Sequence, residues 1–248
     1  MRKGKLYIIG IGPGNSDELT FRAVKALKDS GIICGYDKYI GFIRDSFSGK
    51  EFYSTPMKQE TERCLYAIGK ASDEGKTVSI VSGGDPGVYG MAGLVYELLE
   101  RDDKDTEVEV IPGISASLAG GAVLGAPLMN DFVTISLSDQ LTPWEVIERR
   151  LNAAGMGDFT VCIYNPMSHL RRDNLKKACD ILLKYKDKNT VCGYVRNIGR
   201  EGESSRLISL SELRDEELDM SSTVFIGEAG TRIINGKMVT ERGYGIEG

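Results

Sequence analysis

Three short glycine-rich segments are the parts of this chain best suited to bind a ligand through the backbone. They occupy residues 10–14, 83–87 and 112–113, and each follows a short apolar run typical of a buried strand. Glycine has no Cβ, so backbone N–H and C=O groups there can approach a ligand closely. In an open parallel sheet, ligands bind beyond the carboxyl ends of the strands. Glycine also simply ends strands, but three such turns in register indicate a ligand-binding edge.

The first turn can be interpreted as a dinucleotide-binding turn. Gly10 and Gly12 follow a strand and precede a helix, and Asp37 ends the next strand, where a ribose-binding acid would lie. The dinucleotide fingerprint requires a third glycine where this chain has Asn15, and Pro13 lacks the N–H that would bind pyrophosphate. None of the three turns contains the lysine of a phosphate loop. A nicotinamide-dependent oxidoreductase therefore remains an alternative.

S-adenosylmethionine suits glycine-rich turns that do not form a phosphate loop. It carries adenine, ribose, a carboxylate and a sulfonium but no phosphate, so backbone amides and carbonyls can recognise most of it. Its methyl transfer is an in-line displacement, which a protein catalyses largely by holding nucleophile and methyl group in near-attack geometry. Such a reaction requires neither a nucleophilic triad nor a protein-bound metal, and the sequence shows no pattern typical of either.

Three titratable residues are candidates for a chemical role, each with a structural alternative. Asp37 could act as a proton acceptor, or cap a helix at the end of its strand. Asp85 could contact the ligand or form hydrogen bonds within its own turn. His169, the only histidine, could be a general base, an axial ligand to a substrate metal or an exposed residue at a helix start. One histidine cannot form a usual protein metal site, so we expect none.

A basic cluster in the second half of the chain is a candidate for binding carboxylates. It consists of Arg171, Arg172, Lys176 and Lys177, and Arg196 is a similar candidate. Arginine binds carboxylates in a bidentate geometry. The alternative is a solvated helix face whose charge is partly neutralised by neighbouring acids.

The composition predicts a folded protein of the cytoplasm. The 248 residues include 31 Lys and Arg and 36 Asp and Glu, a formal net charge of −5, which does not attract nucleic acid or an anionic membrane. No apolar run approaches the length of about 18 residues that a membrane-spanning helix needs. The five cysteines are odd in number and widely spaced, which favours buried thiols in a reducing compartment.

The elements that must position these residues alternate between strand and helix. Strands are predicted at residues 5–9, 32–34, 77–81 and 107–111, and helices at 16–30, 61–72 and 90–99. Continuous apolar strands between helices imply a mostly parallel sheet covered on both faces.

The second half begins with the same alternation and then contains more strand than helix. Strands are predicted at 132–137, 159–164, 190–195, 206–210 and 223–226, helices after Thr142 and at 170–185, and a hairpin at Asn235-Gly236. The change in character predicts two α/β domains, residues 1–114 and 115–248.

Longer motifs along the chain resemble those of the tetrapyrrole methylase family. They are GIGPGNSDELT from residue 10, SGGDPGVYG from 82, PGISA from 112, ISLSDQLTPWEVIERRL from 135, YNP from 164, VRNIGREGE from 195 and MVTERGY from 238. The fourth and last resemble the branch of that family that methylates carbon 17 of a precorrin-type macrocycle in cobalamin biosynthesis. The chain has Met129-Asn130, Met167 and Glu241 where the pattern has Gly-His, Arg and Pro.

The resemblance implies a homodimer of two-domain α/β subunits, with S-adenosylmethionine in a cleft between the domains and a tetrapyrrole as substrate. S-adenosylhomocysteine is then the product of the cofactor. The cofactor contacts that it implies are Pro13, Gly83, Gly84, Asp85, Val88, Ser115, Ala116, Asn165 and Ile198. In this branch, methylation at carbon 17 is coupled to contraction of the macrocycle, which extrudes a ring carbon.

Several alternatives stay open. Within the family, the methylated position could be carbon 11 or 20. Outside it, the chain could be the oxidoreductase named above or a tetrapyrrole-binding carrier. The motifs do not distinguish metal-free precorrin-3B from cobalt-factor III as the substrate.

Overall fold

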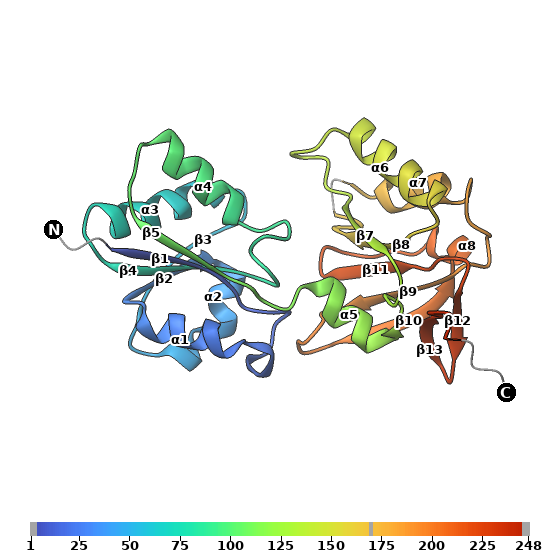
Figure 1. Ribbon diagram of the computed structural model, residues 1–248, viewed down its shortest axis with the longest axis horizontal. Coiled ribbons are helices and arrows are strands. Elements are labelled where there is room, and N and C mark those ends of the chain that lie inside the picture. The colour runs from blue at the N-terminus through green and yellow to red at the C-terminus, as the bar shows by residue number, and fades with distance from the viewer. Residues whose placement is uncertain (1–3, 169–170, 245–248) are drawn as a thin grey trace. The chain divides into compact units, whose positions relative to one another are not determined.

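The chain forms two compact units, Met1–Ser115 and Ala116–Gly248. The computed structural model describes residues 4–168 and 171–244. The first unit runs from blue to green in Figure 1 and the second from green to red. Each has its own sheet with helices packed against it and its own apolar cores, so the predicted α/β class is confirmed.

The first unit contains a parallel sheet of five strands, in the order β3-β2-β4-β1-β5. The strands are β1 (Lys5–Gly10), β2 (Ile32–Tyr36), β3 (Glu51–Thr55), β4 (Thr77–Ser82) and β5 (Glu107–Ile111). All neighbouring pairs are parallel, so their carboxyl ends lie at one edge of the sheet. The ends of β1, β4 and β5, which precede the three glycine-rich turns, are adjacent at that edge.

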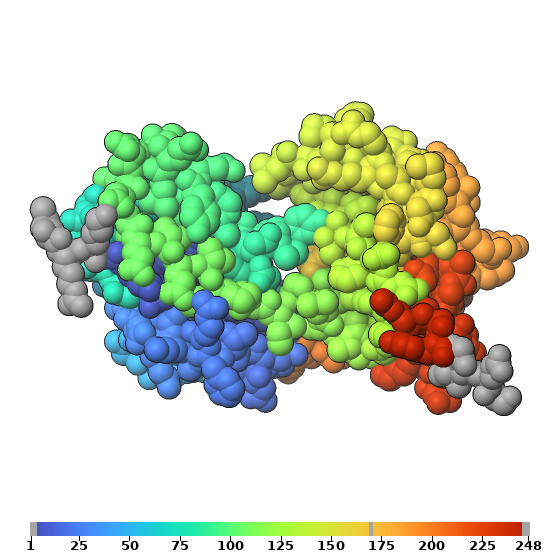
Figure 2. Space-filling view, viewed as in Figure 1, coloured from blue at the N-terminus to red at the C-terminus, as the bar shows by residue number. Residues whose placement is uncertain are grey.

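Helices cover both faces of this sheet, as Figure 1 shows. They are α1 (Phe21–Asp29), α2 (Asp37–Ile43), α3 (Glu60–Ser72) and α4 (Ala92–Arg101), with short 3₁₀ helices at Ser16–Glu18 and Asp45–Phe47. Because side chains alternate along a strand, Ile8 packs with α3 and α4 while Ile9 packs with α1 and α2. In the space-filling view, green side chains of α4 and blue side chains of α1 lie on opposite sides of this unit (Figure 2).

The second unit contains a mixed sheet in the order β10-β9-β11-β8-β7. Its strands are β7 (Phe132–Ser136), β8 (Thr160–Tyr164), β9 (Val191–Arg196), β10 (Ser204–Ser209) and β11 (Ser222–Ile226). β7 and β8 are parallel, and β11 is antiparallel to both β8 and β9. The carboxyl ends of β7, β8 and β9 therefore lie at the same edge.

Within residues 116–168 and 171–244, four helices and a small sheet complete the second unit. The helices are α5 (Ala116–Leu124), α6 (Trp144–Met156), α7 (Asn174–Leu182) and α8 (Leu210–Leu213). The small sheet joins β6 (Gly125–Ala126), β12 (Thr231–Ile234) and β13 (Lys237–Thr240). β12 and β13 form the predicted hairpin, whose turn residues Asn235 and Gly236 have φ of 49° and 74°. Across residues 4–168 and 171–244, no helix has the length and hydropathy needed to cross a bilayer.

The first helix begins later than the sequence pattern predicts. Residues 16–18 form a 3₁₀ turn, and α1 begins at Phe21. The cause is local: the Thr20 hydroxyl accepts a hydrogen bond from the backbone N–H of Ala23 and caps the helix.

We expect the cysteines of the native protein to resist alkylation. All five are buried free thiols. Burial raises the pKa of Cys64, Cys162 and Cys179 to about 12, and it also raises the pKa of Cys34 and Cys192. Because the thiolate is the reactive form, iodoacetamide at pH 8 should label them only after unfolding in urea. Mass spectrometry that finds any of them labelled within minutes in the native protein would contradict this.

Candidate functional site

The three glycine-rich turns of the first unit meet at the carboxyl edge of its sheet. Gly12 and Gly84 form an isolated antiparallel bridge, with the Gly84 N–H donating to the Gly12 carbonyl at 2.7 Å and the reverse bond at 3.2 Å. Both residues have left-handed backbone, with φ of 70° and 66°. The first two turns are therefore held as one backbone structure that glycine permits.

The third turn packs against the other two so closely that no side chain fits. A Cβ on Gly113 would lie 2.2 Å from the Gly84 oxygen and 2.7 Å from the Gly10 carbonyl carbon. A Cβ on Gly10 would lie 2.5 Å from the Gly84 oxygen. The predicted juxtaposition of the three turns is therefore present in the structure.

Asp85 fastens the second turn to the third. Its Oδ1 accepts a hydrogen bond from the Gly87 N–H at 2.8 Å, and its Oδ2 accepts one from the Gly113 N–H at 3.1 Å. Both carboxylate oxygens thus bind backbone, which is the structural alternative that the sequence left open. Asp85 positions the edge through these two bonds.

Other residues assigned to the cofactor differ in how they lie at this edge. Pro13 is buried, while Gly83 and Val88 are half-buried. A Cβ on Gly83 would lie 2.8 Å from the Tyr39 ring, so the aromatic ring packs directly on this turn. Ser115 is buried at the end of the first unit, and Ala116 begins α5 in the second.

Asp37 is exposed at the start of α2, directly after β2, at the same edge. Tyr36 occupies the N-cap position of α2, and no side chain forms a capping hydrogen bond at the start of this helix. The alternative role of Asp37 as a capping carboxylate is therefore not observed. Its carboxylate faces solvent and is accessible to a ligand.

The corresponding edge of the second unit carries Asn165 and Ile198. Asn165 follows β8 with φ of 52°, and its Nδ2 donates to the Ser136 hydroxyl at 3.0 Å. Ile198 is buried among apolar side chains of α5 and β11, so its backbone rather than its side chain is the part able to face a ligand. Tyr164, the first residue of the YNP motif, accepts the Ser117 N–H through its hydroxyl at 2.8 Å and so holds the start of α5, a structural role that the sequence did not reveal.

The basic candidates differ in how far their side chains are engaged within the protein. The Arg171 side chain, 9% exposed, binds the hydroxyls of Ser168 at 3.1 Å and Ser138 at 2.5 Å. The Arg196 guanidinium lies over the Tyr194 ring and donates to the Glu217 carbonyl. Arg172 is exposed and lines an open cavity of about 730 Å³.

His169 lies outside the described residues. Within residues 4–168 and 171–244, no group of three or more His, Cys, Asp or Glu side chains is arranged to hold a metal ion.

The residues that depart from the family pattern have partners of their own. Asn130 Nδ2 donates to the Glu228 carboxylate at 2.7 Å and to the Glu241 carbonyl at 3.0 Å. The Met167 sulfur accepts the Leu218 N–H at 3.1 Å. Asn130 and Glu241, two of the residues that depart from the family pattern, thus contact each other, and the second unit accommodates them together.

The donor set of the first edge fits a ligand without phosphate. The three turns offer backbone N–H and C=O groups and contain no Lys or Arg. Asp85, the one carboxylate among residues 10–14, 82–88 and 112–115, is occupied by backbone N–H groups. S-adenosylmethionine matches such a set, because most of its polar groups are neutral.

Comparison with known proteins agrees with this chemistry. The family described as Tetrapyrrole (Corrin/Porphyrin) Methylases matches residues 5–214. A probable cobalt-factor III C(17)-methyltransferase of Salmonella typhimurium is 44% identical over 96% of this chain and 99% of its own. A precorrin-3B C(17)-methyltransferase of a Sinorhizobium species is 35% identical over 93% and 91%. The crystal structure of the methyltransferase CobJ has a TM-score of 0.88 at 34% identity, covering 96% of this chain and 100% of that one. The chain belongs to the tetrapyrrole methylase family.

Proposed function

We propose that this protein transfers a methyl group from S-adenosylmethionine to carbon 17 of a precorrin-type macrocycle in cobalamin biosynthesis, with contraction of the ring. The observation that carries the proposal is the 44% identity to the Salmonella C(17)-methyltransferase over nearly the full length of both chains. The structural likeness to CobJ supports it. The higher identity to the cobalt-factor III relative than to the precorrin-3B relative, 44% against 35%, favours the cobalt-containing substrate.

In this proposal the glycine-rich edge of the first unit binds the cofactor, which supplies the electrophilic methyl group when bound. Backbone groups of Pro13, Gly83, Gly84 and Val88 hold the adenosine and methionine parts, and Asp85 keeps the turns in place. Ser115, Ala116, Asn165 and Ile198 are the remaining proposed contacts. Catalysis rests mainly on orientation, because the displacement requires nucleophile and methyl group to be in line.

Asp37 is the proposed proton acceptor. Its carboxylate is exposed at the same edge as the turns and is not used as a helix cap. A carboxylate in reach of the substrate could remove a ring proton after methylation. His169 remains a second proposed residue for this role.

We further propose that the enzyme is cytoplasmic and forms a homodimer. Light scattering of the purified protein would test whether it is a dimer.

The two neighbouring arginines Arg171 and Arg172 should separate structural from substrate effects. Arg171→Gln removes hydrogen bonds of a buried guanidinium and should lower the free energy of unfolding by about 1–3 kcal/mol. Arg172→Gln should leave the urea midpoint unchanged, because Arg172 is exposed. It should raise the KM for the macrocycle, because Arg172 is a candidate for binding the carboxylates of the macrocycle. Urea titration and steady-state kinetics of both variants check this. Equal effects on stability would contradict it.

Calorimetric titration with S-adenosylhomocysteine, with NAD as the control, tests the proposed cofactor. The expected result is binding of the homocysteine compound and none of NAD. Binding of NAD alone would favour the oxidoreductase, and binding of neither compound, with retention of a tetrapyrrole, would favour the carrier.

A further inference from the structure

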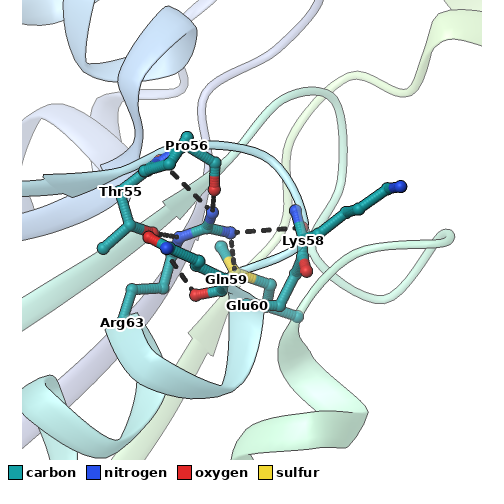
Figure 3. A network of polar contacts seen from close by, with 7 residues as sticks. Thr55, Pro56, Lys58, Gln59, Glu60 and Arg63 are labelled. Atoms are coloured by element: carbon teal, nitrogen blue, oxygen red, sulfur yellow. Dashed lines mark hydrogen bonds and ion pairs between the residues drawn. The ribbon is translucent and has the colours of Figure 1, made fainter.

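Arg63 is a charged side chain buried in the first unit that the catalytic proposal does not use. It lies on α3 and is 2% exposed. Figure 3 shows its guanidinium among residues that follow β3. Nε donates to the Thr55 hydroxyl at 2.9 Å, and one terminal nitrogen donates to the Pro56 carbonyl at 2.8 Å and the Thr55 carbonyl at 3.4 Å.

These contacts fix a segment that neither strand nor helix holds. Residues 56–59 connect β3 to α3 at the carboxyl edge of the sheet, where the glycine-rich turns also lie. Burial of a guanidinium is tolerated only when its donors are satisfied, and here two main-chain carbonyls satisfy part of them. Arg63 therefore determines the path of residues 56–59.

The same network holds Lys58 in an unusual backbone conformation. Lys58 has φ of 73°, a region that residues with a Cβ avoid. Its N–H donates to Glu60 Oε1 at 3.2 Å, and that same oxygen lies 3.6 Å from a terminal nitrogen of Arg63. In Figure 3 the Lys58 side chain extends away from the network. The Lys58 ammonium group therefore points outward from this network.

The charge of this ammonium is not balanced within the structure. Lys58 is exposed and forms no ion pair with any residue in the described ranges, and the same holds for Lys38, next to Asp37 on α2. In the second unit, Arg171 pairs with Asp139, Lys176 with Asp215 and Arg206 with Glu216, whereas the exposed Arg172 forms no ion pair within the described residues. A polycarboxylate ligand would therefore find uncompensated cations after β2 and β3.

We propose that residues 56–59 form a subsite in which Lys58 binds a peripheral carboxylate of the macrocycle, with Arg63 as its positioning residue. The inference rests on the proposed function, since the peripheral acetate and propionate groups of a precorrin-type substrate are the carboxylates concerned. An ammonium held at a fixed backbone position binds such a group as a point charge.

The test compares Lys58→Gln, Lys58→Arg and Lys58→Gly with a control, Lys25→Gln, which alters an exposed lysine on α1. Lys58→Gln should raise the KM for cobalt-factor III about 10-fold, the scale of one hydrogen bond to a charged group, with kcat and the Kd of S-adenosylhomocysteine unchanged. Lys58→Arg should restore most of the KM. Lys58→Gly should raise KM in the same way and shift the urea midpoint upward, because glycine adopts positive φ without strain.

Arg63→Lys provides the positioning test. It should raise KM as Lys58→Gln does, and combining the two changes should add little, because both act through the same ammonium. If Arg63→Lys does not fold, the Lys58 variants still decide the question. A KM unchanged in Lys58→Gln, or a loss of cofactor affinity in the Lys58 variants, would overturn the subsite while leaving the proposed function intact. A wild-type protein that neither binds S-adenosylhomocysteine nor methylates the macrocycle would overturn both.

Discussion

Gly113→Ala is expected to reduce the affinity for S-adenosylhomocysteine by about 10- to 100-fold, because overpacking of this kind costs about 1–3 kcal/mol. The new Cβ would lie 2.2 Å from the Gly84 oxygen and 2.7 Å from the Gly10 carbonyl carbon, so backbone rather than a flexible side chain must move. Movement of the third turn would also break its hydrogen bond to Asp85. Calorimetry with S-adenosylhomocysteine measures the effect.

Gly93→Ala is the matched control for this variant. Gly93 lies in α4, and nothing lies within 4 Å of a Cβ added there. Alanine should stabilise the helix by about 1 kcal/mol and leave ligand affinity unchanged. If Gly113→Ala bound the ligand as tightly as Gly93→Ala does, the three turns would not form the cofactor site.

Asp85→Ala is expected to have a comparable effect for a different reason. It removes the acceptor of two backbone N–H groups, and hydrogen bonds to a charged group contribute about 1.5–3 kcal/mol each. The second and third turns would lose the link between them. We expect affinity for S-adenosylhomocysteine to fall at least about 10-fold and the urea midpoint to decrease.

Asp85→Asn should fall between the wild type and Asp85→Ala. The amide oxygen can accept one of the two hydrogen bonds, but the NH₂ group faces the other N–H and cannot accept it. Asp29→Ala, which changes an exposed carboxylate at the end of α1, should change neither quantity. Normal affinity in Asp85→Ala would show that the turns keep their arrangement without the carboxylate.

The sequence predicted the sheet of the first unit better than its outer elements. The apolar runs at β1, β4 and β5 are each followed by a glycine-rich turn. The local sequence therefore indicates each strand, the point where the strand ends and the edge of the sheet that could bind a ligand. β3 and α2 were not predicted. The residues of β3 are half-polar because it is an edge strand, and α2 contains Gly41 and two aromatic residues, which weaken a helical pattern.

The predictions for the second unit were less accurate at helix ends. The helix predicted over residues 170–185 spans Asn174–Leu182. The helix predicted after Thr142 begins at Trp144, and its N-cap residue is Pro143 rather than the threonine that the sequence pattern favours as a cap. Hydrogen bonds between segments distant in the chain, such as Asn174 Nδ2 to the Leu137 carbonyl at 2.8 Å, influence these boundaries, and spacing does not reveal them.

The motifs identified the family correctly, but they could not reveal how individual side chains are used. The family match confirms the resemblance. Arg171 and Asp85 have residue types suited to binding a ligand, yet in the structure both hold loops together. No sequence pattern marked Arg63 as a positioning residue, because its partners are the main-chain carbonyls of Thr55 and Pro56 and the Thr55 hydroxyl. Only the fold brings such groups together.

The most direct test of the proposed function is to incubate the purified protein with S-adenosylmethionine carrying a ¹³C-labelled methyl group and, separately, with cobalt-factor III or precorrin-3B. Mass spectrometry and ¹³C NMR of the product would then locate the label. We expect one labelled methyl group at carbon 17 of a ring-contracted product, formed faster from cobalt-factor III. Label at another ring carbon would contradict the assigned position, and binding of the macrocycle without transfer of label would contradict the methyltransferase itself.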